Sequence, residues 1–545
     1  MQGKKDITPK MLYQVHIDDL VPKDNFYRKL NAALDLKFIY RQTEKYYGTE
    51  GPESIDPVVF FKICLVGYLN NINSDRKLIE FCSNCLDVRL YLKYDIDEAL
   101  PWHSTISRTR QLYGEEIFLN LFKKVLSLCV ENGMVRGKRQ AIDSALVKAN
   151  ASMDSLLEKE ILDDVQTYAE ELNEHSEHKI EKQNSITPDD KGYTTVSRQK
   201  HKDVSQHHDW KTEAYKDQPS NANGKQVDEH GILIRPKFLS NHTHCSPTDP
   251  DARIAVKPGK ARQMNYFAQI AVDDSNHVIT AAGADFADKR DSQCLQHILN
   301  QTINNLKENE ITLAQIAADT GYSSGTVLKY CNDKNIDAYI PNFGQYKNER
   351  EGFFYNQEKD QYECTRGNKA VLPFRKIKES HDKNVMKVYR SNNSKCKECP
   401  LRASCIGTTD FKKIEHSIHK PLYDAMHEKL KSKYAKTIMR KRSSTVEPVL
   451  GTLINFTNMK RINTRGINQA NKHIMMAALT YNLKKYLKFK TAKRISVCIA
   501  LENQVLLTIK GQFSTIFNLR SFMKRHTTEI ICCSYNTPYS ITVIF

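Results

Sequence analysis

The chain is organised around residues 139–150, which read Arg139-Gln-Ala-Ile-Asp143-Ser-Ala-Leu-Val-Lys-Ala-Asn150. The apolar residues of this stretch form a short run that is typical of a buried strand. Asp143 stands in the middle of the run. Because an unpaired carboxylate in an apolar strand costs several kcal/mol, we expect a cation or hydrogen-bond donors beside it. The alternative, on this segment alone, is an aspartate that caps a turn at the end of the strand.

The same pattern, an apolar run that ends in a carboxylate, recurs at Leu313-Ala-Gln-Ile-Ala-Ala-Asp319. Gly321 and a Ser-capped helix over 323–331 are predicted to follow it. In an open α/β sheet, functional groups gather where strands end and helices begin, so Asp319 lies where chemistry is expected. For Asp143 and Asp319 to meet, their strands must be neighbours in the sheet.

The segments around these two strands complete an α/β pattern. Residues 265–273 and 277–285 predict an antiparallel hairpin, 291–305 a helix, and 338–342 a further short strand. The order is strand with Asp, antiparallel strands, helix, strand with Asp, helix, strand. This order indicates an α/β fold with a ribonuclease H-like core. We expect residues 136–342 to form the first part of that core.

Size and charge limit the possible partners. A chain of 545 residues predicts about three or four domains. Its net charge of +17 and pI near 9.1 favour a polyanionic partner, with nucleic acid the first candidate and a membrane surface the second. The charge is concentrated in residues 421–490, where 15 Lys and Arg face 3 Asp and Glu, a net +12.

The first residues lack the apolar core of a signal peptide, and no run of about 18 apolar residues occurs. We therefore expect a cytoplasmic protein without a membrane partner. In a reducing compartment, the 14 cysteines are expected to be thiols or metal ligands rather than disulfides.

Residues 1–135 are predicted to form a helical domain. Pro57 is suited to the first turn of a buried helix over 58–69. After a loop around Trp102, expected in the core, Ser104 is suited to cap a helix over 105–113 that exposes Arg108 and Arg110. This arrangement fits a helix-turn-helix-like DNA-binding domain in which both arginines contact DNA. An ordinary helical bundle with solvated arginines is the alternative. Residues 153–247 read as a polar insertion in the core.

Residues 343–420 are predicted to form a small Cys-rich β insertion. Cys396, Cys399 and Cys405 have ligand-like spacing, and Cys364 lies upstream in a hairpin-like segment. Four thiolates would close a tetrahedral structural zinc site, which would hold together a segment with little core of its own. Free thiols are the alternative, and His416 and His419 are alternative ligands.

A third carboxylate, Glu447, follows a very basic segment in Arg440-Lys-Arg-Ser-Ser-Thr-Val-Glu447-Pro-Val-Leu-Gly. Its apolar neighbours indicate a partly buried helix. Residues 421–488 are interpreted as the basic helical end of the catalytic core, with a last amphipathic helix over 468–487. Residues 489–545 form an extension of unknown role.

These motifs together resemble the DDE transposases of bacterial insertion sequences. The resemblance covers residues 20–488 and rests on His-Ser-Thr-Ile-Ser-Arg, Ala-Ile-Asp143-Ser, Asp-Pro-Asp-Ala-Arg, Ala-Asp319-Thr-Gly-Tyr-Ser, the Cys-x-x-Cys-Pro cluster and Val-Glu447-Pro-Val-Leu-Gly. By motif position, it implies that Asp143, Asp319 and Glu447 are the catalytic triad. Three acids from separate segments suit Mg²⁺ or Mn²⁺, which prefer oxygen ligands and, as a pair of ions, assist phosphodiester cleavage.

The resemblance also implies the partners: double-stranded DNA, as element ends and target, a homodimer assembled on it, and a place at the bacterial nucleoid. Many relatives carry a Tyr and an Arg shortly before the Glu and a basic residue about two turns after it. Here Arg442 lies five residues before Glu447 and the next basic residue is Lys460. The residues expected to bind DNA phosphates are Arg442, Lys460, Arg461 and Arg465.

Two other functions remain open on the sequence. One is a DNA-binding protein without catalysis, either inactive or regulatory, and the other is a metal-dependent nuclease that cuts without joining. The presence of all three acids argues against an inactive core.

Overall fold

The computed structural model describes the backbone of residues 16–48, 54–158, 240–241, 243–255, 262–344, 346, 349–379, 385–516, 528–532 and 539–543, and side chains up to residue 493. Residues 159–239, the greater part of the predicted polar insertion, lie outside the described residues. Among the described residues, no helix is both long enough and apolar enough to span a bilayer.

The N-terminal part of the chain is helical, as predicted. Its elements are α1 (Ile17–Leu20), α2 (Phe26–Ala33), α3 (Phe38–Thr43), η1 (Glu44–Tyr46), α4 (Pro57–Leu69), α5 (Asp75–Asn84), α6 (Leu86–Leu92), α7 (His103–Leu112) and α8 (Glu115–Glu131). Helix α4 begins with Pro57 and is buried over most of its length. The Asp56 side chain caps it, because Oδ1 accepts hydrogen bonds from the backbone N–H of Val58 at 2.6 Å and of Val59 at 3.1 Å.

A mixed sheet follows, with strand order β4-β5-β1-β7-β8 and β6 paired with β5. Its strands are β1 (Arg139–Lys148), β4 (Arg253–Ala255), β5 (Gln263–Asp273), β6 (Ile279–Phe286), β7 (Gln315–Ala317) and β8 (Asp337–Tyr339). Strands β1, β7 and β8 run parallel, whereas β5 is antiparallel to both β1 and β6. The predicted hairpin and short strands are therefore confirmed.

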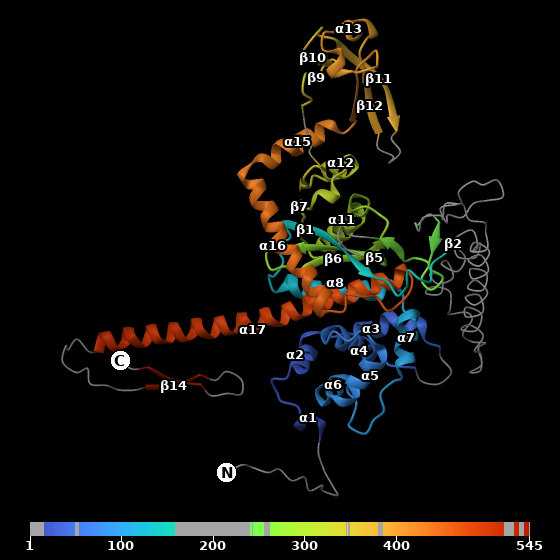
Figure 1. Cartoon of the computed structure of the whole chain (residues 1–545). Helices are drawn as coiled ribbons and strands as arrows, with labels where there is room; N and C mark the ends of the chain where they lie inside the picture. The colour runs from blue at the N-terminus through green and yellow to red at the C-terminus, as the bar shows by residue number, and fades with distance from the viewer. Residues whose placement is uncertain are drawn as a thin grey trace, which may run out of the picture.

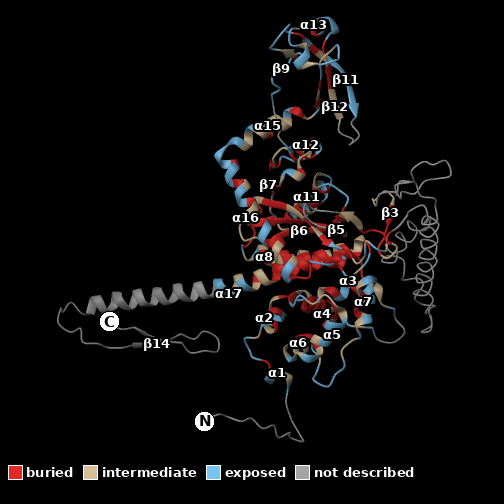
Figure 2. Ribbon diagram, viewed as in Figure 1, coloured by how far each residue is buried: buried red, intermediate tan, exposed pale blue. Residues whose placement is uncertain are grey.

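Helices cover this sheet on both sides. The chain alternates its strands with α11 (Asp291–Lys307), η4 (Thr320–Tyr322) and α12 (Gly325–Asp333), and adds a small pair, β2 (Leu157–Glu158) and β3 (His244–Cys245). Figure 2 shows that the buried residues are concentrated in the sheet and in the helices next to it, α8 and the first part of α17 (Ile467–Ile516).

The outer edge of β6 is satisfied by side-chain amides rather than by another strand. Asn482 of α17 accepts a hydrogen bond from the Ile279 N–H and donates one to the Ile279 carbonyl, each at 2.8 Å. Asn305 of α11 donates to the Thr280 carbonyl at 2.8 Å, and Asn471 accepts from the Ala284 N–H. These bonds satisfy backbone groups that an edge strand would otherwise leave unpaired in a buried position.

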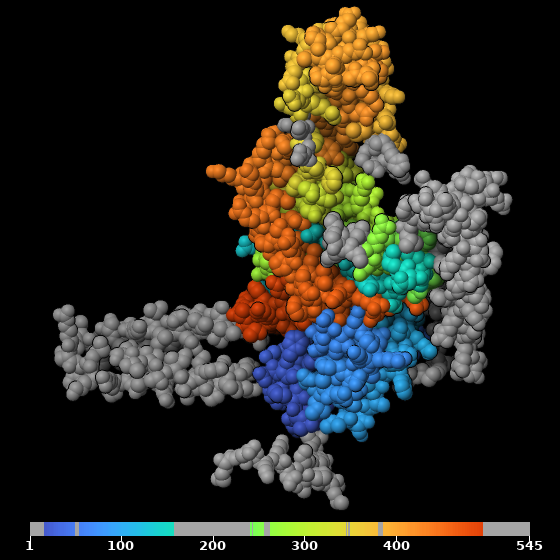
Figure 3. Space-filling view, in the orientation of Figure 1, coloured from blue at the N-terminus to red at the C-terminus, as the bar shows by residue number. Residues whose placement is uncertain are grey.

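The Cys-rich insertion is a second sheet, an antiparallel meander in the order β13-β12-β11-β10-β9. It consists of β9 (Phe353–Asn356), β10 (Gln361–Cys364), β11 (Val371–Glu379), β12 (Val385–Arg390), β13 (Lys413–Ser417) and the short helices α13 (Asn393–Lys397) and α14 (Arg402–Cys405). Its core contains Tyr362, Leu372, Tyr389 and Ile414. The insertion stands at the opposite end of the molecule from the N-terminal helices (Figure 3).

Helices α15 (Lys420–Lys431) and α16 (Lys433–Phe456) lead from the insertion back to the central sheet (Figure 1). The prediction that the last helix ends near residue 487 is wrong, because α17 continues to Ile516. No proline and no glycine interrupts the sequence between Ile467 and Lys510, so nothing in the backbone stops the helix earlier. A hairpin of β14 (Thr528–Cys532) and β15 (Tyr539–Val543) follows.

The start of α17 is fixed by the Asp-Pro-Asp-Ala-Arg loop. Asp249 accepts a hydrogen bond from the Gly466 N–H at 3.0 Å, and Asp251 accepts one from the Ile467 N–H at 2.9 Å. The Tyr266 hydroxyl donates to Asp249 at 2.6 Å. A carboxylate at a helix N-terminus satisfies free N–H groups and interacts favourably with the helix dipole.

The cysteines whose side chains are described are all free thiols, as expected. Most of them are buried, and burial raises the pKa of the Cys82 and Cys129 thiols to about 12.

Asn482 provides a test of the edge of the sheet. We expect Asn482→Ala to lower the free energy of unfolding by about 2–4 kcal/mol, because it leaves a buried N–H and a buried carbonyl without partners. The measurement is urea unfolding of the full chain. Asn468→Ala, on the same helix but outside this pairing, is the control and is expected to change stability by less than about 0.5 kcal/mol. Equal effects of the two substitutions would contradict this account of the edge.

Candidate active site

Asp143 and Asp319 lie side by side because their strands are adjacent and parallel. The pairing of β1 with β7 aligns Arg139 with Gln315 and Ala141 with Ala317. Each aspartate stands two residues beyond the last aligned alanine of its strand. The expectation that the two strands are neighbours is therefore confirmed, and the strand pairing alone brings the two carboxylates to one level of the sheet.

The surroundings of the two aspartates differ. Asp143 is within β1, and its side chain is only 15% exposed. Asp319 follows β7 and caps η4, where its Oδ1 accepts a hydrogen bond from the Gly321 N–H at 2.9 Å. The Asp319 side chain is 43% exposed. The pair therefore has one carboxylate against the core and one toward solvent.

A cation lies between them, as the sequence predicted for Asp143. Arg442 of α16 places its Nη2 2.8 Å from Asp143 Oδ2 and 3.9 Å from Asp319 Oδ2. The Arg442 side chain is only 8% exposed. A guanidinium buried in this way offsets the unfavourable burial of the Asp143 charge.

Burial is nevertheless the larger effect on Asp143. It raises the pKa of this carboxyl from the ordinary value of 3.8 to about 6, although Arg442 and the Ser144 N–H favour the charged form. The negative charges of Asp319 and Asp291 raise this pKa further. Asp143 is thus a carboxylate that the surrounding positive charge does not fully stabilise.

Asp291 is a residue of this site that the sequence analysis missed. Its Oδ1 accepts a hydrogen bond from the Ser144 hydroxyl at 2.5 Å. A Cβ at Gly321 would lie 2.7 Å from Asp291 Oδ2 and 3.1 Å from Asp319 Oδ1, so only glycine lets these two carboxylates approach. In the sequence, Asp291 looks like an ordinary acidic residue at the start of a helix. Only its position after the second strand of the hairpin indicated an edge of the sheet.

Glu447 does not join the two aspartates in this structure. It lies on α16, which packs on β1, but it is exposed, whereas Arg442 on the same helix is buried. Five residues correspond to about 140° around a helix, so the two side chains leave α16 in different directions. Across the described parts of the chain, no three His, Cys, Asp or Glu side chains form a group that could hold a metal ion.

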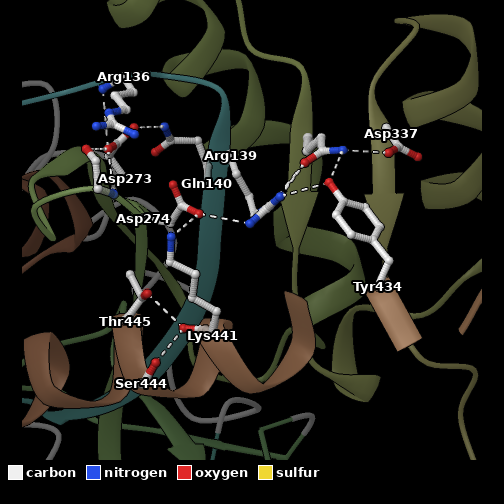
Figure 4. Close-up of polar contacts among 12 residues, drawn as sticks. Arg136, Arg139, Gln140, Asp273, Asp274, Asp337, Tyr434, Lys441, Ser444 and Thr445 are labelled. Atoms are coloured by element: carbon white, nitrogen blue, oxygen red, sulfur yellow. Dashed lines mark hydrogen bonds and ion pairs between the residues drawn. The ribbon is translucent and has the colours of Figure 1, made fainter. Parts of the chain in front are cut away.

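Polar contacts fix α16 against the start of β1 (Figure 4). Asp274 pairs with both Arg139, at 3.0 Å, and Lys441, at 2.9 Å. Arg139 also donates a hydrogen bond to the Tyr434 hydroxyl at 3.1 Å. Because Lys441 precedes Arg442 in the helix, these contacts set the position from which Arg442 reaches the aspartates.

The two arginines predicted to bind DNA in the N-terminal domain differ. Arg108 is exposed, as expected. Arg110 is not: its guanidinium pairs with Asp75 at 2.7 and 3.0 Å and its side chain is 18% exposed. Arg110 lies four residues after the buried Ile106 and therefore on the inner face of α7. Contact between Arg110 and DNA stays a prediction. The pairing of Arg110 with Asp75 on the inner face of α7 does not favour it.

Two further expectations about this helix are wrong. Trp102 is 78% exposed rather than in the core, because it precedes the helix and lies outside the face formed by Ile106 and Thr109. Ser104 is not the cap, because α7 begins one residue earlier, at His103.

The predicted phosphate contacts Lys460, Arg461 and Arg465 are all exposed. Arg461 lines a pocket of about 390 Å³ together with Lys148, at the end of β1, and several polar residues. The Arg461 guanidinium donates a hydrogen bond to Asn150 Oδ1 at 3.1 Å. These basic side chains therefore lie where β1 leaves the sheet.

The predicted zinc ligands Cys364, Cys396, Cys399 and Cys405 do not form a metal-binding group in this geometry. The Cys396 thiol lies 3.0 Å from the Ser391 hydroxyl, and the Cys364 thiol lies 2.6 Å from the Arg366 carbonyl. His416, an alternative ligand, is instead enclosed by tyrosines and contacts the Tyr362 hydroxyl at 2.8 Å. The insertion has an aromatic core of its own, in which Tyr362 and Tyr389 are buried.

The raised pKa of Asp143 predicts a pH-dependent stability of the ion-free protein. Between about pH 4 and pH 6, the folded protein keeps a proton on Asp143 that the unfolded chain has lost. The stability contributed by this proton is therefore lost as the pH rises through that window, by up to roughly 3 kcal/mol. Urea unfolding in EDTA should show that the free energy of unfolding of the unmodified protein falls as the pH rises through this window, and that the free energy of unfolding of Asp143→Asn does not.

Asp333→Asn, an exposed carboxylate in an ion pair with Lys329, is the control and should retain the fall. An Asp143→Asn variant with the same pH dependence as the unmodified chain would contradict the assignment of this titration to Asp143.

Comparison with known families gives two matches. A family described as a transposase domain (DUF772) matches residues 15–112, and a family described as a transposase DDE domain matches residues 363–487. No curated protein matches the chain. The first match covers helices α1 to α7, and the second covers most of the insertion, from within β10, together with helix α16, which carries both Arg442 and Glu447. Both matches are to transposase families, and together they support a DDE transposase of an insertion element.

Proposed function

We propose that the protein cleaves DNA at the ends of its insertion element and transfers the freed strand into target DNA. The observation that carries this proposal is the pair of carboxylates, Asp143 and Asp319, on adjacent parallel strands with a buried cation between them. A transposase that joins DNA must place phosphates next to such acids. The family matches make DNA the expected partner.

A ribonuclease H-like core is part of the proposal. The order β6-β5-β1-β7-β8, with β5 antiparallel to its neighbours and the two pairings of β1 with β7 and of β7 with β8 parallel, supports it. In this arrangement, β1 is central, so a carboxylate in it is fixed more rigidly than one on a loop.

DDE transposases generally depend on divalent metal ions. The donors fit such an ion in their chemistry, since Asp143 and Asp319 are hard oxygen ligands and already hold a positive charge between them. Asp143 and Asp319 would hold Mg²⁺ or Mn²⁺, which when bound would activate the attacking oxygen and stabilise the leaving oxygen. Glu447, which is exposed on α16 in this structure, would join them as a ligand only after a rearrangement of that helix. Zinc in the insertion is not part of the proposal, because the cysteines do not fit it.

The basic side chains have a separate role. Lys460, Arg461 and Arg465, exposed near the end of β1, are proposed to bind the DNA backbone. Arg108 and the N-terminal helices are proposed to contribute to recognition of the element end. Two element ends must be brought together for transposition, so the active assembly is proposed to be a homodimer on DNA.

Substitution of the acids tests the proposal. We expect Asp143→Asn, Asp319→Asn and Glu447→Gln each to reduce Mg²⁺-dependent cleavage of labelled element ends by at least ~100-fold, because each removes a charged ligand of the metal ions that would act on the reacting phosphate. DNA binding, measured by gel retardation, should change little. Asp333→Asn is the matched control and should cleave normally.

The products of the unmodified protein separate the remaining possibilities. Joined strand-transfer products support a transposase, cut products without joining indicate a nuclease, and retarded DNA without cutting indicates a binding protein. Full cleavage by any one of the three acid variants would remove that residue from the proposed triad.

A further inference from the structure

The space between the two aspartates already holds a positive charge that belongs to the protein. Arg442 Nη2 is within ion-pair distance of both Asp143 and Asp319. Among the residues whose side chains are described, Arg442 is the one basic side chain that pairs with Asp143. A guanidinium and a divalent cation would compete for the same carboxylate oxygens.

We propose that Arg442 is the resident counter-cation of the Asp143–Asp319 pair in the ion-free protein, and that a divalent cation enters only as Arg442 leaves. This inference rests on the proposed function, because it takes the two aspartates as cation ligands. Arg442 then acts as a positioning residue: it keeps the carboxylates together before the cation arrives and sets how tightly the cation is held.

Charge balance requires such a residue. Asp143 is 15% exposed, and the carboxylates of Asp319 and Asp291 lie close enough to act on its charge. A Cβ at Gly321 would touch both Asp291 and Asp319, which shows how near these two carboxylates are to each other. Negative groups brought together in this way repel unless a cation lies among them, and Arg442 supplies the one available before metal binds.

The contacts of Arg442 are those of a side chain that can be displaced. The shortest contact of Arg442 with each aspartate is made by Nη2, at 2.8 Å to Asp143 and at 3.9 Å to Asp319, and the contact with Asp319 is too long for a hydrogen bond. Its Nε is buried and makes no hydrogen bond. A buried donor without a hydrogen-bond partner is unfavourable. When a metal ion displaces the Arg442 side chain, this N–H can form a hydrogen bond elsewhere, which favours the displacement.

The exchange needs no movement of the helix. Lys441 and Tyr434 hold α16 to Asp274 and Arg139 of the sheet through contacts that do not involve Arg442 (Figure 4). The released guanidinium would be free to bind a DNA phosphate. Cation and DNA would then strengthen each other's binding, because both favour the same position of Arg442.

Direct measurement of cation binding tests the inference without relying on activity. Mn²⁺ is titrated into the ion-free full chain, and free Mn²⁺ is followed by electron paramagnetic resonance. Arg442→Met removes the competing charge while keeping an apolar stem, so we expect it to bind Mn²⁺ about tenfold more tightly than the unmodified protein. Arg440→Met removes the same charge from an exposed position of the same helix and is expected to stay within about twofold.

Stability gives a second readout from the same proteins. In EDTA, Arg442→Met should unfold at a lower temperature than the unmodified chain, and Mn²⁺ should raise its unfolding temperature by more than it raises that of the unmodified chain. If Arg442→Met does not fold, Arg442→Lys replaces it. A lysine retains the charge but not the guanidinium nitrogens. We therefore expect Arg442→Lys to bind Mn²⁺ more tightly than the unmodified protein but by less than tenfold, and this result would support the inference.

The outcomes separate this inference from the proposed function. If Asp143→Asn abolishes Mn²⁺ binding but a folded Arg442→Met binds no more tightly than the unmodified protein, the counter-cation role of Arg442 is wrong and the metal site stands. If Mn²⁺ binding does not depend on Asp143 in any variant, both are wrong.

Discussion

The buried charge of Asp143 is the constraint on which the rest of the structure depends. An apolar strand does not tolerate a carboxylate alone, and β1 is the central strand of the sheet. The parallel pairing with β7 brings Asp319 beside it and so increases the repulsion. The Arg442 guanidinium pairs with both carboxylates, although Arg442 lies about 300 residues after Asp143 in the sequence. Arg442 thus links α16 to the sheet in addition to their hydrophobic packing.

The last helices of the chain pack back on the central sheet, where they satisfy groups that the sheet leaves without partners. Asp249 and Asp251 hold the start of α17, and Asn482, further along α17, satisfies the edge of β6. Without these helices, the sheet would expose an unpaired edge and an unbalanced carboxylate. Residues 421–488 therefore pack with the central sheet, and the second sheet lies in the chain between β8 and α15.

Patterns that depend on local periodicity were predictable from the sequence. The strand around Asp143, the hairpin and the buried helix after Pro57 are examples, because each is decided within a few residues of itself. What depends on tertiary contacts was not predictable. Arg110 reads as a surface arginine until Asp75 is placed beside it, and Asp291 reads as a helix start until Gly321 brings it to Asp319. The cysteine spacing suggested zinc, because a sequence does not reveal that Tyr362, Leu372, Tyr389 and Ile414, one from each of four strands, already form a core.

The exposed fraction of the acidic side chains increases from Asp143 to Asp319 and from Asp319 to Glu447. Asp143 is 15% exposed, Asp319 is 43% exposed, and Glu447 stands in solvent. Because α16 is anchored by Lys441, its buried face carries Arg442 and its outer face carries Glu447, about 7.5 Å further along the helix. If Glu447 acts with the aspartates, as proposed, the reacting phosphate must enter from the solvent side, over Asp319. The exposed Lys460, Arg461 and Arg465 follow α16 in the chain, so the segment that supplies Glu447 also leads to the residues proposed to hold the DNA.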